Sequence, residues 1–274
     1  MTTPAVALTI AGLDPTGGAG LAADLRTFDA FGVHGAAVVT TLTVQDTSTF
    51  VSAEPTDVTL LAAQLERLLG DLDVAAVKIG MVPSVEILQL LGSLAPKLPR
   101  LVLDPVAVDR HGSALVGSRE RDEMLSGLLA ACEIVTPNRA ELAWLLDTEI
   151  APEGDAAMLE RQVHELRGLG AASVVVTGGR GGTSEAVDIF VGPESRRVWS
   201  EQRLPTRNDR GSGCTFSAAI AAALAQGDSV ERAVGRAHDF VQRAILAAIQ
   251  WRIGSGTGPV NQRTAGRGHA TPNA

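Results

Sequence analysis

The chain is poor in cysteine and contains no long apolar run. Cys132 and Cys214 are the only cysteines among 274 residues, too few for a disulfide framework, so each is considered as a thiol. No segment approaches the length of a transmembrane helix, and membrane insertion is therefore not expected. The first four residues carry no basic region, and the short apolar run 5–11 favours a first strand over a signal peptide. We expect a cytoplasmic protein.

Positive charge is also scarce in this sequence. The 31 Asp and Glu residues outnumber the 23 Lys and Arg residues, which gives a formal net charge of -8. This balance argues against a general nucleic-acid binder, although it leaves room for a local cationic pocket that binds phosphate. We therefore expect small molecules as partners, with no nucleic acid and no membrane.

Two common nucleotide-binding motifs are absent. The glycine-rich stretch 12–20 lacks the G-x-G-x-x-G spacing of dinucleotide-binding folds, and the chain contains no G-x-x-x-x-G-K-[ST] segment. These absences exclude P-loop nucleotide chemistry and give no support to a dinucleotide site.

Short β-type runs alternate with helical patterns along most of the chain. The expected strands are residues 5–10, 36–43, 75–79, 100–103, 134–136 and 173–177, and the expected helices are residues 21–31, 58–69, 84–94, 119–131, 139–146, 156–169 and 216–226. A hairpin of residues 187–191 and 197–201 follows the last of these strands. The alternation predicts an α/β fold of three α/β/α layers with a mostly parallel, doubly wound sheet. Residues 1–262 are expected to form one domain, and residues 263–274 a disordered tail.

The most informative stretch is a glycine turn that runs into a long apolar helix. Gly211, Ser212 and Gly213 form the turn, and Cys214 stands at the start of the helix. A helix begins with unpaired backbone N–H groups and a positive dipole end, so this segment suits an anion such as phosphate. An ordinary helix with a glycine-rich entry and a buried cysteine is the alternative.

Polar side chains follow several of the expected strands, at the sheet edge where ligands of open parallel sheets collect. Gln45 offers both a donor and acceptors for the edge of a heterocycle, or belongs to a plain polar loop. Asp104 and Glu141 supply carboxylates that suit magnesium, or serve as a turn cap and a first-turn helix residue. The glycine-rich loop 177–182 is able to contact a nucleotide phosphate, whereas Met81 could equally belong to the core.

Seven segments, in this order along the chain, resemble those of one enzyme family. They are residues 11–20 with Asp24, 42–47, 78–81, 104–106, 136–138 with Glu141, 211–214 and 254–260. Together they resemble the bacterial hydroxymethylpyrimidine/phosphomethylpyrimidine kinases of the ribokinase-like superfamily. The resemblance covers most of the chain. It implies a ribokinase-like fold, a homodimer, and ATP-dependent phosphorylation of 4-amino-5-hydroxymethyl-2-methylpyrimidine and its monophosphate in thiamine biosynthesis, with ATP and Mg2+ as cofactors.

The resemblance also implies roles for particular residues. The implied pyrimidine pocket consists of Gly12, Asp24, Gln45, Met81 and Val108. The implied catalytic turn consists of Gly211, Ser212, Gly213 and Cys214. The implied nucleotide-binding residues are Asn138, Thr177, Gly179, Arg180 and Arg210, and the implied magnesium-side residues are Asp104 and Glu141. Cys214 stands where related sugar kinases carry an aspartate, and a thiol at a helix N-terminus can have a lowered pKa and accept the substrate hydroxyl proton.

The chain departs from the family pattern at several of these positions. Thr177 stands where the family usually has a phosphate-binding lysine, and we expect Arg180 or Arg210 to replace that cation. Asp209 and Arg210 stand where a threonine or asparagine and a histidine are common, and Ala107 is smaller than the usual methionine. Two alternatives therefore stay open: a pyridoxal or pyridoxine kinase of vitamin B6 salvage, and a non-catalytic pyrimidine sensor with the same fold.

Overall fold

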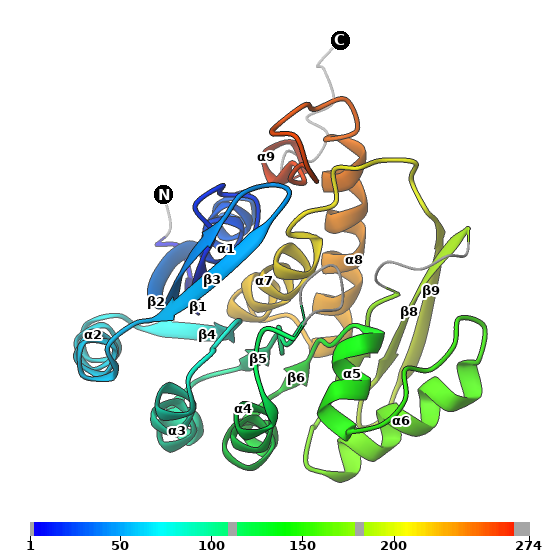
Figure 1. The fold of residues 1–274 in the computed structure, drawn as a ribbon. Helices are drawn as coiled ribbons and strands as arrows, with labels where there is room; N and C mark the ends of the chain where they lie inside the picture. Colours follow the sequence, from blue (N-terminus) through cyan, green and yellow to red (C-terminus); the bar gives the residue numbers. More distant parts are fainter. Residues whose placement is uncertain (1–2, 109–113, 179–183, 266–274) are drawn as a thin grey trace.

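One twisted sheet runs through the computed structural model, which describes residues 3–108, 114–178 and 184–265 (Figure 1). Within these ranges the sheet has nine strands in the order β3-β2-β1-β4-β5-β6-β7-β8-β9. The strands are β1 (Val6–Leu13), β2 (His34–Gln45), β3 (Phe50–Pro55), β4 (Val74–Ile79), β5 (Leu101–Leu103), β6 (Ile134–Val135), β7 (Val174–Val176), β8 (Glu185–Val191) and β9 (Arg196–Gln202). Strands β1, β2, β4, β5, β6 and β7 pair in parallel with one another, whereas β3, β8 and β9 pair antiparallel to their neighbours.

Helices cover both faces of the sheet. Figure 1 shows α1 (Gly20–Ala30), α7 (Ser212–Ala225) and α8 (Val230–Leu246) on one face. The other face is covered by α2 (Val58–Asp71), α3 (Val85–Leu94), α4 (Ser118–Glu123), α5 (Arg139–Leu146) and α6 (Ala156–Gly168). The prediction of a three-layer α/β fold with a mostly parallel, doubly wound sheet is thereby confirmed.

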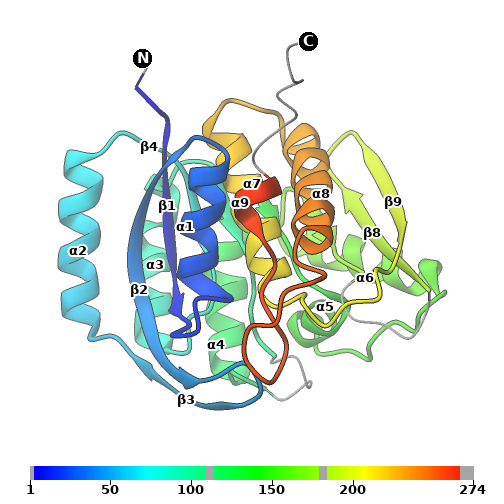
Figure 2. The same ribbon diagram turned by 90° about the horizontal axis from the view of Figure 1, so that it is seen from above.

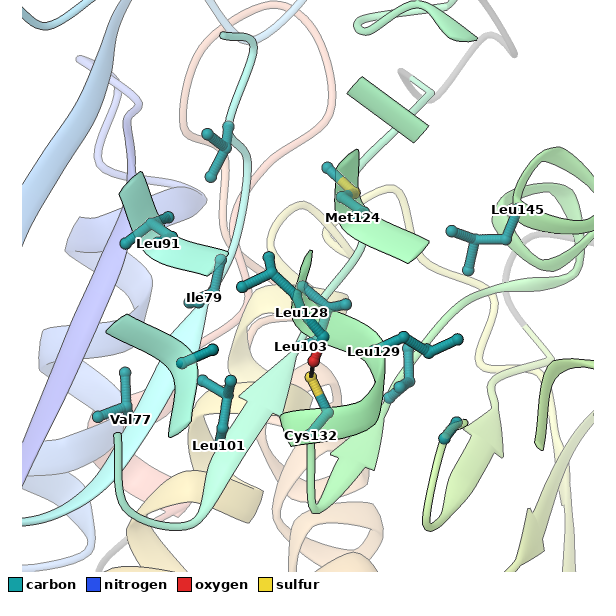
Figure 3. Packing of buried hydrophobic residues seen from close by; sticks show 14 of the residues in the cluster. Val77, Ile79, Leu91, Leu101, Leu103, Met124, Leu128, Leu129, Cys132 and Leu145 are labelled. Atoms are coloured by element: carbon teal, nitrogen blue, oxygen red, sulfur yellow. Dashed lines mark hydrogen bonds between the residues drawn. The ribbon is translucent and has the colours of Figure 1, made fainter. Parts of the chain in front are cut away.

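The alternation of side chains along each strand divides the core between the two faces. Val77 and Ile79 of β4 pack with Leu91 of α3 in one buried cluster, while Ala76 belongs to the cluster under α7 and α8. Figure 3 shows the first cluster, in which the Cys132 thiol donates to the Leu128 carbonyl oxygen at 3.2 Å. Burial raises the pKa of Cys132 far above its ordinary value, so this cysteine is an inert core residue.

The structure differs from the sequence-based expectation at three whole elements. One is the short helix α9 (Gln262–Ala265), which includes residues 263–265 of the expected tail. Strand β3 was not expected, because it is an edge strand with few buried side chains, and Val51 is 66% exposed. Helix α8 was not expected either, although Ser229 caps its start and Val234, Ala237 and Val241 bury one face at helical spacing. The segment 119–131 is also less regular than expected, since α4 passes into a π turn and then a 3-10 turn.

The last described segment closes over the first part of the chain. The Thr257 amide donates to the Thr47 carbonyl oxygen at 2.9 Å, and Gln262 Nε2 donates to Thr215 Oγ1 at 3.0 Å. Helix α9 (Gln262–Ala265) lies beside α1 and α8 (Figure 2). Residues 266–274 of the expected tail lie outside the described residues, so the expected division of the chain stays a prediction. Within the described ranges, none of the helices is long and apolar enough to span a bilayer.

Candidate active site

The candidate site lies where the winding of the sheet reverses. Strand β1 pairs with β2 on one side and with β4 on the other, so the crossovers on its two sides run in opposite directions. Ligands of doubly wound sheets bind outside the carboxyl ends of the strands at such a point. Most of the residues singled out by sequence follow β1, β2, β4, β5, β6 or β7 directly.

Two glycine turns meet at this edge. Gly211 caps α7 with φ of 76°, and a Cβ there would collide with the carbonyl oxygen of Gly18 in the turn after β1. Only glycine combines this left-handed backbone with so close an approach. Two residues further along, a Cβ at Gly213 would meet no described heavy atom within 4 Å. The Ser212 amide donates to the Asp209 carbonyl oxygen at 3.2 Å, and the space beside Gly213 is open. Phosphate binding at the first turn of α7 stays a prediction.

A buried group of charges lies beside this turn. Lys78 of β4 is fully buried, and its Nζ lies 2.9 Å from Asp24 Oδ2 and 3.5 Å from Asp104 Oδ2. Thr9 Oγ1 also donates to Asp24 Oδ2, at 2.6 Å. Burial alone would lower the pKa of Lys78, but the facing carboxylates outweigh it and hold the pKa above its ordinary value. Lys78 therefore remains an ammonium between two carboxylates.

Sequence reasoning did not select Lys78. The signal was present, because a lysine inside the otherwise apolar strand 74–79 requires a charged partner if the strand is buried on both faces. Asp24, expected in the pyrimidine pocket, is also fully buried and faces Lys78. Its pocket role stays a prediction, and in this geometry Asp24 would act through Lys78.

Cys214 lies in the first turn of α7 and retains part of its exposure. The expectation of a lowered pKa is wrong, because the pKa of this thiol is raised to about 12. Burial has the largest effect and disfavours the thiolate, and the carboxylates of Asp104 and Asp24 add to it against the opposing charge of Lys78. The raised pKa favours the protonated thiol, and the role of Cys214 as a base stays a prediction.

Asp104 and Glu141 bring two buried carboxyl groups to the same edge. The Ser217 hydroxyl of α7 donates to Asp104 Oδ2 at 2.8 Å, and the Asn138 amide donates to Glu141 Oε2 at 2.9 Å. Burial, followed by the charge of Asp104, raises the pKa of Glu141 to about 8. A cation would relieve this repulsion. In the described ranges, no group of three or more His, Cys, Asp or Glu could hold a metal ion directly. Magnesium held at this pair largely through its own waters stays a prediction.

Asn138 and Thr177, both expected to bind nucleotide, lie next to each other. They form an isolated parallel bridge, and the Thr177 amide donates to the Pro137 carbonyl oxygen at 3.0 Å. Asn138 also caps α5, since its Oδ1 accepts from the Glu141 amide at 2.9 Å. Gly179 and Arg180 lie outside the described residues.

Arg210 lies at the other end of the site. Its Nε donates to Asp14 Oδ2 at 3.0 Å, and its Nη2 donates to Gln45 Oε1 at 2.6 Å. In this arrangement the guanidinium faces Gln45, and its expected contact with a nucleotide phosphate stays a prediction. Asp14 lies in the segment 11–20 and is not among the predicted site residues; its charge next to a glycine turn was the available signal.

Gly12 and Met81, two of the remaining residues expected in the pocket, lie together at the end of β1. A Cβ at Gly12 would lie 2.8 Å from Thr41 Cγ2 and 3.8 Å from Met81 Cβ, so the Gly12 backbone and Met81 are neighbours. The Met81 carbonyl oxygen accepts from Thr40 Oγ1 at 2.5 Å, which fixes the chain after β4. Val108, after β5, forms an isolated bridge with Ala114. Their contact with a pyrimidine stays a prediction.

Comparison with known proteins places this geometry in a family. A family model described as phosphomethylpyrimidine kinase matches residues 14–261. The hydroxymethylpyrimidine/phosphomethylpyrimidine kinase of Rhizobium meliloti (strain 1021) is 42% identical over 258 residues, which cover 94% of this chain and 96% of that protein.

Solved structures extend the similarity to two kinds of kinase. The pyridoxal kinase from Staphylococcus aureus in complex with ADP matches with a TM-score of 0.87 at 27% identity, covering 97% of this chain and 96% of that chain. The phosphomethylpyrimidine kinase from Clostridium difficile 630 matches with a TM-score of 0.76 at 34% identity, covering 88% of this chain and 99% of that chain.

Proposed function

Because this chain belongs to the phosphomethylpyrimidine kinase family, we propose that it phosphorylates 4-amino-5-hydroxymethyl-2-methylpyrimidine with ATP. The γ-phosphoryl group passes from ATP to the hydroxymethyl oxygen and leaves ADP. A second transfer to the monophosphate yields the diphosphate. This activity belongs to thiamine biosynthesis.

One observation carries the proposal beyond family membership. Arg210 immediately precedes the Gly211 turn, and its side chain bonds to Gln45, the expected reader of the ring edge. A ring held at Gln45 is therefore close to the amides that begin α7. This arrangement supports a reaction in which a hydroxymethyl group on the ring receives a phosphoryl group at the start of that helix.

The residues of the site suit phosphoryl transfer through charge stabilisation. The amides of the α7 first turn, together with buried Lys78, provide fixed positive potential for the charge that spreads over the transferring group. Asp104 and Glu141 would hold magnesium through its waters, and that ion would neutralise phosphate charge. Because phosphoryl transfer has a loose transition state, a protonated Cys214 is compatible with it.

The test is ADP production from ATP and magnesium with three separate acceptors: the hydroxymethylpyrimidine, its monophosphate and pyridoxal. Product masses identify what was phosphorylated. Turnover of both pyrimidines with mass gains of one phosphoryl group is the expected result. If neither pyrimidine is phosphorylated, the proposed function is wrong. Binding of the pyrimidine without ADP release would instead favour a sensor.

A pyridoxal kinase is the second candidate. The observation that favours it is the similarity to the ADP-bound pyridoxal kinase of Staphylococcus aureus, whose TM-score exceeds that of the Clostridium difficile phosphomethylpyrimidine kinase. Turnover of pyridoxal alone would establish it. The ADP in that relative also supports the use of ATP by this chain.

The assembly and location of the enzyme complete the proposal. We expect a homodimer, as the family resemblance implies, and a cytoplasmic location, as the sequence analysis predicts. Light scattering on purified protein distinguishes a mass of two chains from the 28.4 kDa of one.

A further inference from the structure

Five residues form a closed loop of four hydrogen bonds and one peptide link. The loop includes Gln45, the residue predicted to read the edge of the substrate ring. Arg210 Nη2 donates to Gln45 Oε1 at 2.6 Å, Gln45 Nε2 donates to Thr43 Oγ1 at 2.7 Å, and Thr43 Oγ1 donates to the Leu13 carbonyl oxygen at 2.8 Å. Leu13 is covalently joined to Asp14, whose Oδ2 accepts from Arg210 Nε at 3.0 Å. This hydrogen-bonded loop therefore begins and ends at the guanidinium of Arg210.

The hydrogen bonds of this loop have only one possible donor-to-acceptor direction. A guanidinium has donors and no acceptor, and a carbonyl oxygen accepts only. Arg210 must therefore face the oxygen of the Gln45 amide. The Thr43 hydroxyl must donate to the Leu13 carbonyl oxygen and accept from Gln45 Nε2. The chemistry of these neighbours therefore decides which atom of the Gln45 amide is the oxygen and which is the nitrogen.

Arg210 cannot easily leave this arrangement. Its partner Asp14 is 3% exposed, and the Asp14 carboxylate also accepts from the Thr16 and Ala19 amides of the first glycine turn. Arg210 itself is 12% exposed at the side chain. A buried carboxylate would lose its charged partner if the guanidinium moved away.

The fixed amide leaves two groups for a substrate. A primary amide has a second hydrogen on Nε2 and a second lone pair on Oε1, so Gln45 can still donate once and accept once. An aminopyrimidine alcohol carries an amine donor beside its hydroxymethyl group and a ring nitrogen acceptor next to that amine. Pyridoxal carries a carbonyl acceptor beside its hydroxymethyl group. A freely turning glutamine could serve both rings by flipping its amide.

We propose that Arg210 sets the choice of substrate by preventing this flip, so that Gln45 meets an amine and repels a carbonyl at the same place. A flipped amide would set Nε2 against Arg210 Nη2, two donors without an acceptor, and would leave Thr43 facing an oxygen. Arg210 is thus a positioning residue that acts through Gln45. The inference rests on the proposed phosphorylation of the aminopyrimidine.

The test compares wild type with Arg210→His and Arg210→Lys. Histidine is the residue common in related kinases, and a neutral imidazole can face either amide atom. Pyridoxal is measured both as a substrate and as a competitive inhibitor of pyrimidine turnover. We expect Arg210→His to lower the preference for pyrimidine over pyridoxal, measured as a ratio of kcat/KM, by about tenfold or more, the size of one lost charged hydrogen bond. The KM for ATP should stay within about twofold.

Arg207→His is the matched control, because Arg207 bonds the carbonyl oxygens of Ser255 and Gly256 and none of its hydrogen bonds involves Gln45. It should leave the preference unchanged. In a Gln45→Ala background, Arg210→His should no longer change the preference, since the amide through which it acts is gone. Lysine also carries donors and no acceptor but lacks the fixed fork of a guanidinium, so Arg210→Lys should fold as wild type and keep more of the preference than Arg210→His.

Two results would overturn the inference while leaving the proposed function intact. One is an unchanged preference in both Arg210 variants with wild-type thermal unfolding. The other is a large rise in the KM for ATP at constant preference, which would make Arg210 a nucleotide-side cation. Failure of wild type to phosphorylate the pyrimidine would instead reject the proposed function and, with it, this extension.

Discussion

Lys78 Nζ lies 2.9 Å from Asp24 Oδ2, and both side chains are completely shielded from solvent. The pair joins the central strand β4 to helix α1, and a second carboxylate, Asp104, lies 3.5 Å from the same ammonium. Two negative groups and one positive group give this buried cluster a net charge of about -1 when all three are ionised. Such a cluster both stabilises the edge of the sheet and sets the potential around Cys214.

Replacement of Lys78 by methionine should destabilise the protein strongly. Asp24 would become an unpaired buried charge, and breaking such a pair costs about 3–5 kcal/mol of unfolding free energy. Urea unfolding measures this loss. Lys97→Met is the control, because Lys97 is exposed and should change stability by less than about 0.5 kcal/mol. Adding Asp24→Asn to Lys78→Met should restore part of the loss; a further large loss would contradict the charge argument.

Gly211 and Gly213 should respond differently to alanine. Gly211→Ala places a side chain against the Gly18 carbonyl oxygen in a left-handed backbone, so it should lower stability by more than ~2 kcal/mol and abolish turnover. Gly213→Ala meets open space inside α7 and should keep or slightly raise stability, by up to about 1 kcal/mol. Its turnover should still fall at least about tenfold, because the methyl group would occupy the space in which we propose that the phosphoryl group binds. Normal turnover in Gly213→Ala would place the phosphate elsewhere.

Cys214 should behave as a thiol rather than as a thiolate. With its pKa raised to about 12, iodoacetamide should modify it slowly at pH 8, as followed by mass spectrometry. Cys214→Ala should lower kcat by less than the ~10²-fold or more that a general base contributes, with little change in the KM of the pyrimidine. Rapid alkylation together with a larger fall in kcat would restore the base role.

Glu141 should make stability fall as pH rises through the neutral range. The pKa of its carboxyl is about 8 in the folded chain and ordinarily 4.5, so the folded state holds the proton more tightly between these values. Stability is therefore greatest on the acid side of this window and decreases toward pH 8, by up to about 1.4 kcal/mol per pH unit. In Glu141→Gln, thermal unfolding measured at several pH values should no longer show this fall in stability with rising pH.

Exposed Glu66→Gln is the control for the Glu141 experiment and should leave the slope as in wild type. Because magnesium favours the ionised carboxyl, its affinity in the wild-type enzyme should also increase toward pH 8. A slope that persists in Glu141→Gln would assign the titration to another group.

The sequence was sufficient for those parts of the fold that follow from periodicity. The strands of the parallel sheet and the helices that cover it could be predicted, because continuously apolar runs such as Val174–Val176 alternate with amphipathic segments. Strand β3 could not be predicted, since an edge strand that buries little has no apolar alternation to detect. Helix α8 left a detectable signal in the buried spacing of Val234, Ala237 and Val241 that was not used.

The candidate site could likewise be predicted only in part. Motifs identified which residues gather at the sheet edge, but not which of them pair with one another. The contact of Arg210 with Gln45 spans 165 positions, and no local pattern encodes it. The pKa of Cys214 likewise depends on burial and on three charges from distant elements, whereas its position at a helix start suggested the opposite shift.

The bond between Arg210 and Asp14 joins residues 196 positions apart, and the Gly256 amide reaches Thr47 Oγ1 across 209. During synthesis the amino-terminal half must therefore leave the ribosome long before its partners exist. Gln45 acquires its orientation only after nearly the whole polypeptide has emerged, and contacts of such long range form slowly. A nascent chain should consequently be unable to recognise its ring substrate until translation is almost complete.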